Sequence, residues 1–356
     1  MEIVDLRSDT VTLPTPEMRQ AMANADLGDD VYGEDPTVNR LQEVAADMLG
    51  KEAGLFVASG TMGNLAAALA HCQRGDEVIL GKKSHTYLFE AGGISALGGV
   101  HSCQLPNQPD GTIALDDIRA AIRPDDDHCP VTRLVCLENT HNRCGGVSLS
   151  VEYTRSVGQL VHQHGLQLHL DGARIFNAAA AQDVSAKELA APVDSVTFCL
   201  SKGLCAPVGS VLCGSKEFIA RAHRIRKQLG GGMRQAGILA AAGLMALEQM
   251  TGRLSEDHAR ARRLAVGLAQ IPGVILDPGT PYTNMVFLSL AEGVIALESD
   301  EDPAEMVAAR LAEQGILVGV ADRNRFRLVT HYWIHDRAVD RAVQAFAGIL
   351  QPQPAG

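Results

Sequence analysis

Short apolar runs alternate with helical patterns along the first two thirds of the chain. Runs of apolar and β-branched residues predict strands at 55–57, 77–80, 133–137, 166–170 and 196–200. Apolar positions at helical spacing predict helices at 36–50, 86–97 and 152–164, and an alanine-rich helix after residues 59–64. Such alternation is typical of a mostly parallel sheet covered by helices on both faces. We therefore predict an α/β fold whose ligands bind at the carboxyl ends of the strands.

The pattern changes after the three glycines at 230–232. Two long helices are predicted at about 235–250 and 254–270, followed by shorter elements. These are strands at 285–290, 316–320 and 326–330, a helix near 303–314 and a closing helix. A chain of 356 residues also exceeds one ordinary core. We therefore predict a large domain over 1–250, including an N-terminal arm, and a smaller α+β domain over 251–356.

Composition narrows the class of protein. The net charge is −11 and no basic cluster follows a helix, which argues against a nucleic-acid partner. No apolar run reaches the roughly 20 residues needed to span a bilayer, and charges come too early for a signal peptide. The eight cysteines form no CxxC pair, which favours a compartment in which the thiols remain reduced. We expect a cytoplasmic protein that does not associate with membranes.

Lys202 and Asp171 carry the most informative chemistry. Each follows a predicted strand that is too apolar for a surface edge. Alone, Lys202 could be a solvated lysine and Asp171 a turn residue. Together they suit pyridoxal phosphate (PLP), which a lysine holds as a Schiff base while a carboxylate keeps its pyridine nitrogen protonated.

Other residues near the same predicted edge support this interpretation. Gly60 and Thr61 lie between a strand and a helix, where backbone N–H groups and a hydroxyl can bind phosphate, although a plain turn is the commoner explanation. His85 follows another strand and could stack on the cofactor or handle a proton, or could be an ordinary histidine at a helix N-terminus. Arg174 and Arg327 are candidates to clamp a substrate carboxylate.

Two further histidine patterns are less informative. His128 lies among aspartates and is typical of an exposed loop. His162 and His164 point away from each other on a helix, and no metal-binding motif accompanies them, so we expect no catalytic metal.

Eight motifs in order make the chain resemble the threonine aldolases, which have the aspartate-aminotransferase-like fold of PLP enzymes. The motifs are Asp5–Thr12, Gly28–Gly33, Ser84–Glu90, Glu138–Asn142, His169–Arg174, Leu200–Gly203, Gly230–Gln235 and Arg327–His331. The resemblance implies retro-aldol cleavage of L-threonine or L-allo-threonine to glycine and an aldehyde.

The resemblance also implies a role for each matching residue. Lys202 would form the Schiff base, Asp171 would pair with the pyridine nitrogen and His85 would stack on the ring. His128 would meet the substrate β-hydroxyl alongside His85. The remaining implied roles are cofactor binding by Gly60, Thr61 and Arg174, phosphate contacts from a neighbouring subunit by Lys227 and Arg234, and substrate binding by Ser8, Tyr32, Arg174 and Arg327. Contacts from a neighbouring subunit imply a homo-oligomer with shared active sites that is at least a dimer. The resemblance suggests a tetramer.

Three other functions are alternatives to aldol cleavage. A PLP-dependent β-eliminating lyase would share the fold and the lysine but break Cα–H, and the paired histidines favour the aldolase instead. A non-catalytic PLP-fold regulator is disfavoured by the intact lysine and the lack of a DNA-binding segment. A nicotinamide dehydrogenase would need a GxGxxG loop, which is absent.

Overall fold

The computed structural model describes residues 3–295 and 302–350, which form two compact units. One unit is Leu13–Gly252, and the other joins the N-terminal residues up to Thr12 with the chain from Arg253 onward. The predicted boundary after residue 250 therefore lies two residues from the observed one. The N-terminal arm, which we predicted as part of the large domain, belongs instead to the second unit.

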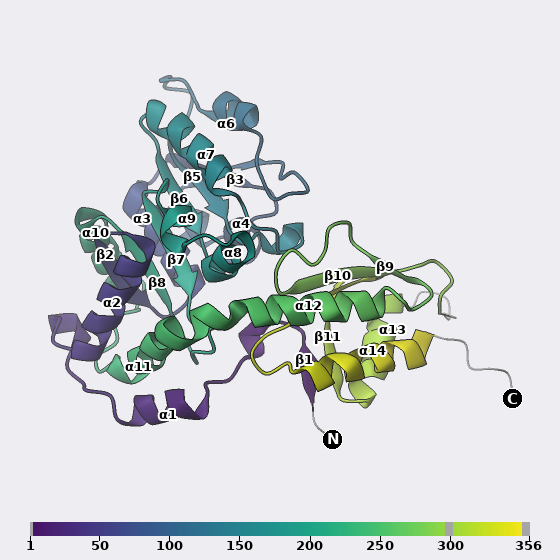
Figure 1. Ribbon diagram of the computed structural model, residues 1–356. Helices are drawn as coiled ribbons and strands as arrows, with labels where there is room; N and C mark the ends of the chain where they lie inside the picture. Colours follow the sequence, from purple (N-terminus) through teal and green to yellow (C-terminus); the bar gives the residue numbers. More distant parts are fainter. Residues whose placement is uncertain (1–2, 296–301, 351–356) are drawn as a thin grey trace, which may run out of the picture. The chain divides into compact units, whose positions relative to one another are not determined.

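A seven-stranded sheet forms the centre of the large unit (Figure 1). Its strands are β2 (Ala53–Val57), β3 (Asp76–Gly81), β4 (His101–Leu105), β5 (Val131–Glu138), β6 (Gln167–Asp171), β7 (Ser195–Cys199) and β8 (Ser210–Gly214), in the order β2-β8-β7-β6-β5-β3-β4. The pairs among β4, β3, β5, β6 and β7 are parallel, and β8 runs antiparallel to both of its neighbours. The predicted α/β fold with a mostly parallel sheet is confirmed.

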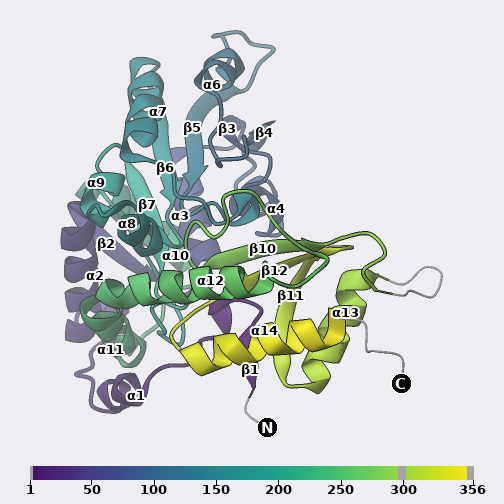
Figure 2. The same ribbon diagram turned by 45° about the vertical axis from the view of Figure 1, so that its right-hand side comes forward.

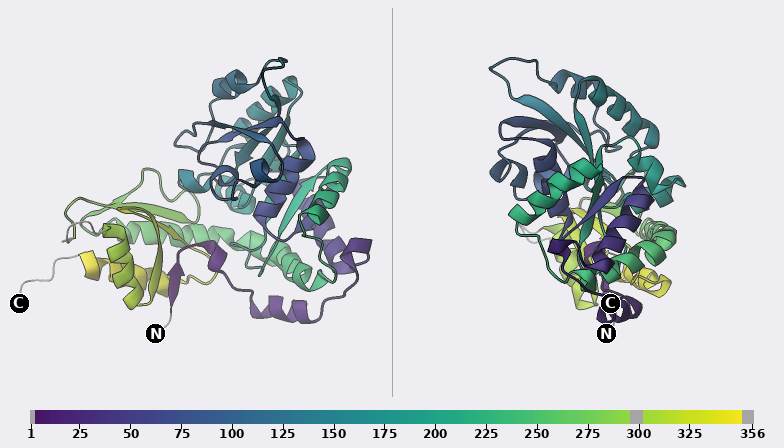
Figure 3. Two further views of the ribbon diagram at one scale, coloured as in Figure 1. Left: turned by 180° about the vertical axis from the view of Figure 1, so that it is seen from behind. Right: turned by 90° about the vertical axis from the view of Figure 1, so that its left-hand side faces the viewer.

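Helices cover both faces of this sheet (Figures 1 and 3). Among the described residues, the α-helices of the unit with five residues or more are α1 (Pro16–Ala23), α2 (Pro36–Leu49), α3 (Gly60–His71), α6 (Leu115–Ala121), α7 (Val151–Gln163), α8 (Ile175–Gln182), α9 (Ala186–Ala190), α10 (Lys216–Gln228) and α11 (Gly237–Met245). One face is closed by α3 and α10, whose alanines and Phe218 pack on Leu55, Val57 and Leu212. Within the described ranges, no helix is both long and apolar enough to cross a membrane.

The single helix predicted at 86–97 is wrong, because the chain breaks it in the middle. Two short helices replace it, α4 (His85–Leu88) and α5 (Gly93–Ala96). Between them Ala91 and Gly92 have φ values of 52° and 65°. Such left-handed backbone ends a right-handed helix. The break places Glu90 beside the His85 ring.

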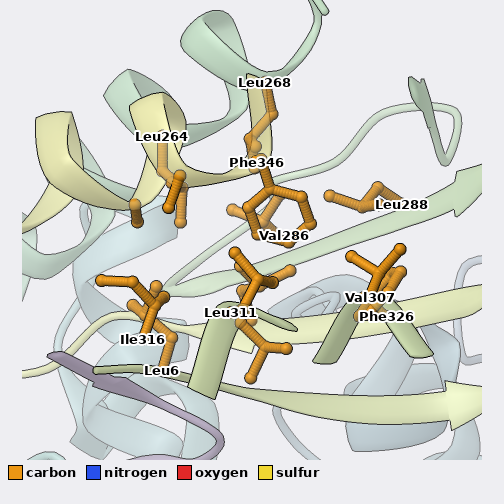
Figure 4. Close-up of a cluster of buried hydrophobic side chains, with 14 of the residues drawn as sticks. Leu6, Leu264, Leu268, Val286, Leu288, Val307, Leu311, Ile316, Phe326 and Phe346 are labelled. Atoms are coloured by element: carbon orange, nitrogen blue, oxygen red, sulfur yellow. The ribbon is translucent and has the colours of Figure 1, made fainter. Parts of the chain in front are cut away.

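In its described residues, the second unit contains a five-stranded sheet in the order β1-β11-β12-β10-β9 together with α-helices (Figure 2). The elements are β1 (Val4–Leu6), α12 (Leu254–Leu268), β9 (Val274–Leu276), β10 (Met285–Leu290), α13 (Pro303–Glu313), β11 (Ile316–Asp322), β12 (Arg325–Val329) and α14 (Asp336–Leu350). The arm belongs here because β1 pairs in parallel with β11. Leu6 and Phe346 lie in one buried cluster with Leu311 and Phe326 (Figure 4). Removing this apolar surface from water stabilises the docked arm.

Within the large unit, a buried ion pair links the segment 29–33 to α10. Arg226 on α10 is 2.7 Å from the Asp30 carboxylate and donates to the Phe56 carbonyl at 2.8 Å. Both charged side chains are at most 5% exposed. Replacing Arg226 with methionine is expected to lower the free energy of unfolding by about 3–5 kcal/mol, because Asp30 would remain buried without its partner. Urea denaturation measures this loss.

Two comparisons test the cause of that loss. Arg221→Ala breaks an exposed pair with Glu217 on the same helix and should cost less than about 1 kcal/mol. The double variant Arg226→Met/Asp30→Leu should recover much of the stability lost in Arg226→Met, since no unpaired charge remains. A double variant no more stable than the single one would show that the charge was not responsible.

Candidate active site

Five strands of the large unit end at the same edge of the sheet. The strands β3, β5, β6 and β7 are parallel, and β2 runs in the same direction because β8 is antiparallel to both β2 and β7. Each strand end leads to a polar residue: Thr61 after β2, His85 after β3, Glu138 at the end of β5, Asp171 at the end of β6 and Lys202 after β7. The ends of parallel strands meet at one edge, so the fold gathers an amine, an imidazole and carboxylates there.

Asp171 is held by hydrogen bonds on both carboxylate oxygens. Its side chain is 4% exposed. The Ala173 backbone N–H donates to Oδ1 at 3.1 Å, and Asn64 Nδ2 donates to Oδ2 at 2.9 Å. Hydrogen bonds of this kind favour the ionised form of a carboxyl group. The arrangement suits a carboxylate that must remain negative beside a cationic partner.

His85 is fixed by two glutamates. Its backbone N–H donates to Glu138 Oε2 at 2.6 Å, and its ring Nδ1 is 2.8 Å from Glu90 Oε1. The hydrogen bond to Glu90 raises the pKa of His85. Burial and the nearby Asp171 charge raise the pKa of Glu90. Both shifts have one consequence: the pair keeps a shared proton to a higher pH than a free histidine would.

This pair gives a prediction for pH dependence. The His85 ring should titrate above the ordinary histidine pKa of about 6.5, and Glu90→Gln should bring its midpoint down. Because the pKa is raised in the folded state, the stability that protonated His85 contributes is fully present below about pH 6.5. It is lost as the pH rises through the higher folded-state pKa. An NMR titration of the histidine rings measures the midpoint, and an unchanged midpoint in Glu90→Gln would contradict the pairing.

The turn from β2 into α3 has the features of an anion site. Ser59 caps α3 by accepting from the Met62 N–H at 3.2 Å. A Cβ added at Gly60 would lie 2.9 Å from Cys199 Sγ and 3.7 Å from Ser210 Oγ. The Ser210 hydroxyl is buried and has no hydrogen-bond partner. A helix N-terminus, a glycine that permits close approach and a buried hydroxyl are suitable for binding phosphate.

The structure does not bring His128 to this edge within one chain. His128 precedes β5, whereas Glu138 ends it, so the two lie at opposite ends of an eight-residue strand. At about 3.3 Å per residue this strand alone is roughly 25 Å long. The His128 side chain is 94% exposed and its Nδ1 is 2.8 Å from Asp126 Oδ1. Within one chain His128 therefore lies away from His85, and its role at the substrate β-hydroxyl stays a prediction.

The three residues predicted to bind the substrate carboxylate are divided between the two units. Arg174 lies at the start of α8 in the large unit and is 7% exposed. Arg327 on β12 is half-buried and donates to the Arg7 carbonyl at 3.1 Å, within the second unit. Ser8, also in the second unit, accepts from the Thr10 N–H at 3.3 Å. The roles of Ser8 and Arg327 thus remain predictions.

Tyr32 and Arg234 come together on the surface of the large unit. The Arg234 guanidinium lies 5.8 Å from the Tyr32 ring centre, and its Nη1 is 2.8 Å from Asp29 Oδ2. The Tyr32 side chain is 75% exposed. Lys227 is exposed at the end of α10. The loop at 231–233 packs near the first turn of α3, since a Cβ at Gly231 would lie 2.3 Å from Met62 Sδ.

These residues together fit pyridoxal phosphate. Lys202 would hold its aldehyde carbon, Asp171 would face its ring nitrogen, and Gly60, Thr61 and Ser210 would receive its phosphate. The buried unpartnered hydroxyl of Ser210 and the close approach at Gly60 are the observations that support the fit. Fold and site together define a PLP-dependent enzyme with the aminotransferase-like architecture.

The chain belongs to the beta-eliminating lyase family, whose model matches residues 5–292. It is 49% identical to low-specificity L-threonine aldolase 1 of Arabidopsis thaliana over 349 residues, covering 97% of this chain and 96% of that protein. It is also 49% identical to low specificity L-threonine aldolase of Escherichia coli K12, covering 82% and 85% of the two chains. The solved threonine aldolase of Leishmania major has the same fold, with a TM-score of 0.81, 21% identity and coverage of 98% and 100%. The predicted resemblance to the threonine aldolases is confirmed, and the protein is a lyase that uses PLP.

Sequence reasoning did not single out three residues that shape this site. Glu90 and Glu138 fix His85, and Asn64 contacts both Glu90 and Asp171. The two glutamates lie within quoted motifs, but nothing in the sequence showed which side chain they contact. Asn64 follows the glycine turn, and its position in the sequence predicts no contact with a carboxylate.

Proposed function

We propose that this chain cleaves L-threonine, L-allo-threonine and related β-hydroxy-α-amino acids to glycine and an aldehyde, reversibly. The observation that carries the proposal is the 49% identity, over nearly the whole chain, to proteins named low-specificity L-threonine aldolases. Lys202, Asp171 and His85 at one sheet edge supply the groups that this reaction needs.

Two residues would set up the cofactor. PLP, when bound, supplies an electron sink for the electron pair of the breaking Cα–Cβ bond. Lys202 would hold the cofactor covalently through its side-chain amine. Asp171, held in place by hydrogen bonds from Ala173 and Asn64, would keep the proton on the ring nitrogen. The carboxylate thereby favours the electron flow that cleavage requires.

His85 would take the proton of the substrate β-hydroxyl, directly or through a water. Its Nδ1 contacts Glu90, so Nε2 is the nitrogen that can reach the substrate. Glu90 orients the ring and shares the proton, which is the arrangement of a base with an orienting partner. By family resemblance, Arg174, Ser8 and Arg327 would hold the substrate carboxylate, and Tyr32 would line the site. Fixing the carboxylate selects which bond of Cα can break.

Product analysis tests this function. The purified, PLP-loaded protein is supplied with L-threonine and, separately, with L-allo-threonine. Acetaldehyde and glycine in equal amounts from either substrate are the expected products, and the ratio of the two rates gives the β-carbon preference. Neither product from either substrate would contradict the proposed substrate class while leaving the fold assignment intact.

β-Elimination is the second candidate function, because the matching family model describes beta-eliminating lyases. An eliminating enzyme with the same fold would remove the Cα proton instead of breaking Cα–Cβ. The same assay separates the two, since elimination from threonine gives ammonia and 2-oxobutyrate. The placement of His85 and Glu90, which suits removal of a hydroxyl proton, favours the aldolase.

We further propose a cytoplasmic homo-oligomer, a dimer at least and a tetramer by resemblance, with shared active sites. Lys227 and Arg234 are exposed, as phosphate contacts donated to a neighbour must be. His128 lies at the far edge of its own sheet, so it would reach a β-hydroxyl only in another copy of the chain.

Complementation tests whether sites are shared. Lys202→Ala and Lys227→Ala chains are each expected to have little activity alone. Mixed and reassembled, they should regain part of it, because some sites then combine an intact Lys202 with an intact Lys227. No recovery in mixed oligomers whose composition is verified by mass would contradict sharing.

A further inference from the structure

A chain of hydrogen bonds runs through the protein behind Asp171 and begins at Asn64. The Asn64 side chain is 2% exposed and its Nδ2 donates to Asp171 Oδ2 at 2.9 Å and to Glu90 Oε1 at 2.8 Å. Its Oδ1 lies 3.1 Å from His169 Nε2. Turning the amide over would place an oxygen against two carboxylates. The contacts therefore assign the amide orientation, with both hydrogens directed at the carboxylates.

The orientation of the Asn64 amide determines which atom donates in each of the remaining hydrogen bonds of the network. Asn64 Oδ1 can only accept, so His169 carries its hydrogen on Nε2 and its Nδ1 accepts from Ser195 Oγ at 2.8 Å. Ser195 Oγ then accepts from His71 Nε2 at 2.7 Å. Burial lowers the pKa of His169 to about 4 and that of His71 to about 3. Both rings are thus neutral near pH 7, and all donors point toward Asp171 and Glu90.

The fold builds this chain from three elements that meet at one face of the sheet (Figure 1). Asn64 and His71 are seven residues apart on α3, which places them on the same side of the helix. His169 and Asp171 are two residues apart on β6 and so share a strand face. The parallel register pairs His169 with Ser195 of β7. The side chains of Ser195 and His169 are at most 1% exposed, so water does not compete for these bonds.

We propose that Asn64, His169 and Ser195 are positioning residues that hold the Asp171 carboxylate for the ring nitrogen of the cofactor. The inference rests on the role of Asp171 proposed above. Asp171 and Glu90 are close enough to contact the same amide, and like charges so placed repel each other. Asn64 gives each carboxylate a donor. Because the donors behind it are neutral, they stabilise the Asp171 anion without adding a cation that would compete with the protonated ring nitrogen.

The test compares substitutions at successive positions of this hydrogen-bond network. Asn64→Leu keeps the approximate size and removes both donors, whereas Ser195→Ala breaks the chain further back and leaves the Asn64 contacts in place. Measurements are the PLP dissociation constant of the cofactor-free protein, the absorption spectrum of the bound cofactor, kcat and KM. Asn64→Leu should weaken PLP binding and lower kcat by roughly 10- to 100-fold, with a smaller change in KM. Ser195→Ala should shift the same quantities in the same direction by a few-fold.

A matched control separates positioning from loss of buried polar groups in general. Thr154 on α7 is fully buried, and its hydroxyl donates to the Ser150 carbonyl at 3.0 Å. Thr154→Val should leave the cofactor spectrum and the PLP dissociation constant unchanged. An equal effect in Thr154→Val and Ser195→Ala would overturn the proposal.

A double-mutant cycle with Asp171→Ala shows whether Asn64 acts through Asp171. If it does, Asn64→Leu should have little further effect on PLP binding in the Asp171→Ala background. Effects that simply add, or a native PLP dissociation constant in Asn64→Leu, would overturn the inference while leaving the Asp171 assignment intact. PLP binding and kcat unaffected by Asp171→Ala alone would instead overturn the proposed role of Asp171, on which the inference depends.

Discussion

Lys202→Ala is expected to remove cleavage of L-threonine and L-allo-threonine, with kcat falling on the order of 10³-fold or more. Lys202 follows β7 at the edge where Asp171 and His85 also lie, and no other residue is assigned the covalent bond to the cofactor. Alanine leaves no amine to hold the cofactor or to return after each turnover. Glycine formation measures activity, and the absorption spectrum of the purified protein reports the covalent bond.

Lys216→Ala is the matched control for this experiment. Lys216 is an exposed lysine in the first turn of α10, so its removal should change neither the spectrum nor the rate. A Lys202→Ala protein with a near-native rate would exclude Lys202 as the lysine that binds the cofactor.

Asp171→Asn is expected to lower kcat by about 10²- to 10³-fold, comparable to the loss of one well-placed electrostatic contact in an active site. Asparagine has nearly the same shape but no charge, so it cannot hold a proton on the ring nitrogen. It would also place an NH₂ group or a neutral oxygen where Asn64 now donates. Steady-state kinetics measures kcat, and the spectrum of the bound cofactor reports its protonation.

Asp194→Asn provides a control at another aspartate that accepts a backbone N–H but lies away from the site. Asp194 Oδ2 accepts from the Leu168 N–H at 2.7 Å and lies 3.0 Å from His162 Nε2. It precedes β7 and so lies at the opposite end of that strand from Lys202. Its substitution should alter stability more than the rate. Equal losses of kcat in Asp194→Asn and Asp171→Asn would show that the charge of Asp171 has no special role.

The positions of the main strands and helices could be predicted because their patterns are periodic and uninterrupted. The strands predicted at 133–137 and 166–170 lie within or overlap β5 and β6, and the helix predicted at 152–164 is α7 to within one residue at each end. The helix predicted at 86–97 failed because local backbone geometry at Ala91 and Gly92 outweighed the apolar pattern. The arm was misassigned because β1 pairs with a strand about 310 residues later, and spacing along the chain gives no sign of that.

The residues of the candidate site also divide into those that the sequence predicted and those that it did not. Lys202, Asp171 and His85 were predictable, since each follows a strand and carries chemistry that ordinary turns do not require. Glu90 and Asn64 were not, because their importance lies in which atoms they contact across two helices and a strand. His128 shows another case: its surroundings in the sequence predicted an exposed loop, the family resemblance implied a role, and the residue precedes β5, at the opposite end of that strand from Glu138.

The sequence by itself determined the fold class, the reactive groups and the edge at which three of them gather, because alternating strands and helices force parallel strand ends together. Only the tertiary structure decided how those groups are held. The amide of Asn64 and the neutral rings of His169 and His71 depend on distances of about 3 Å between residues more than 100 positions apart in the chain. The shared proton of His85 and Glu90 depends on a similar distance that the break between α4 and α5 creates. Hydrogen bonds depend on such distances and directions, whereas the order of residues along the chain specifies neither.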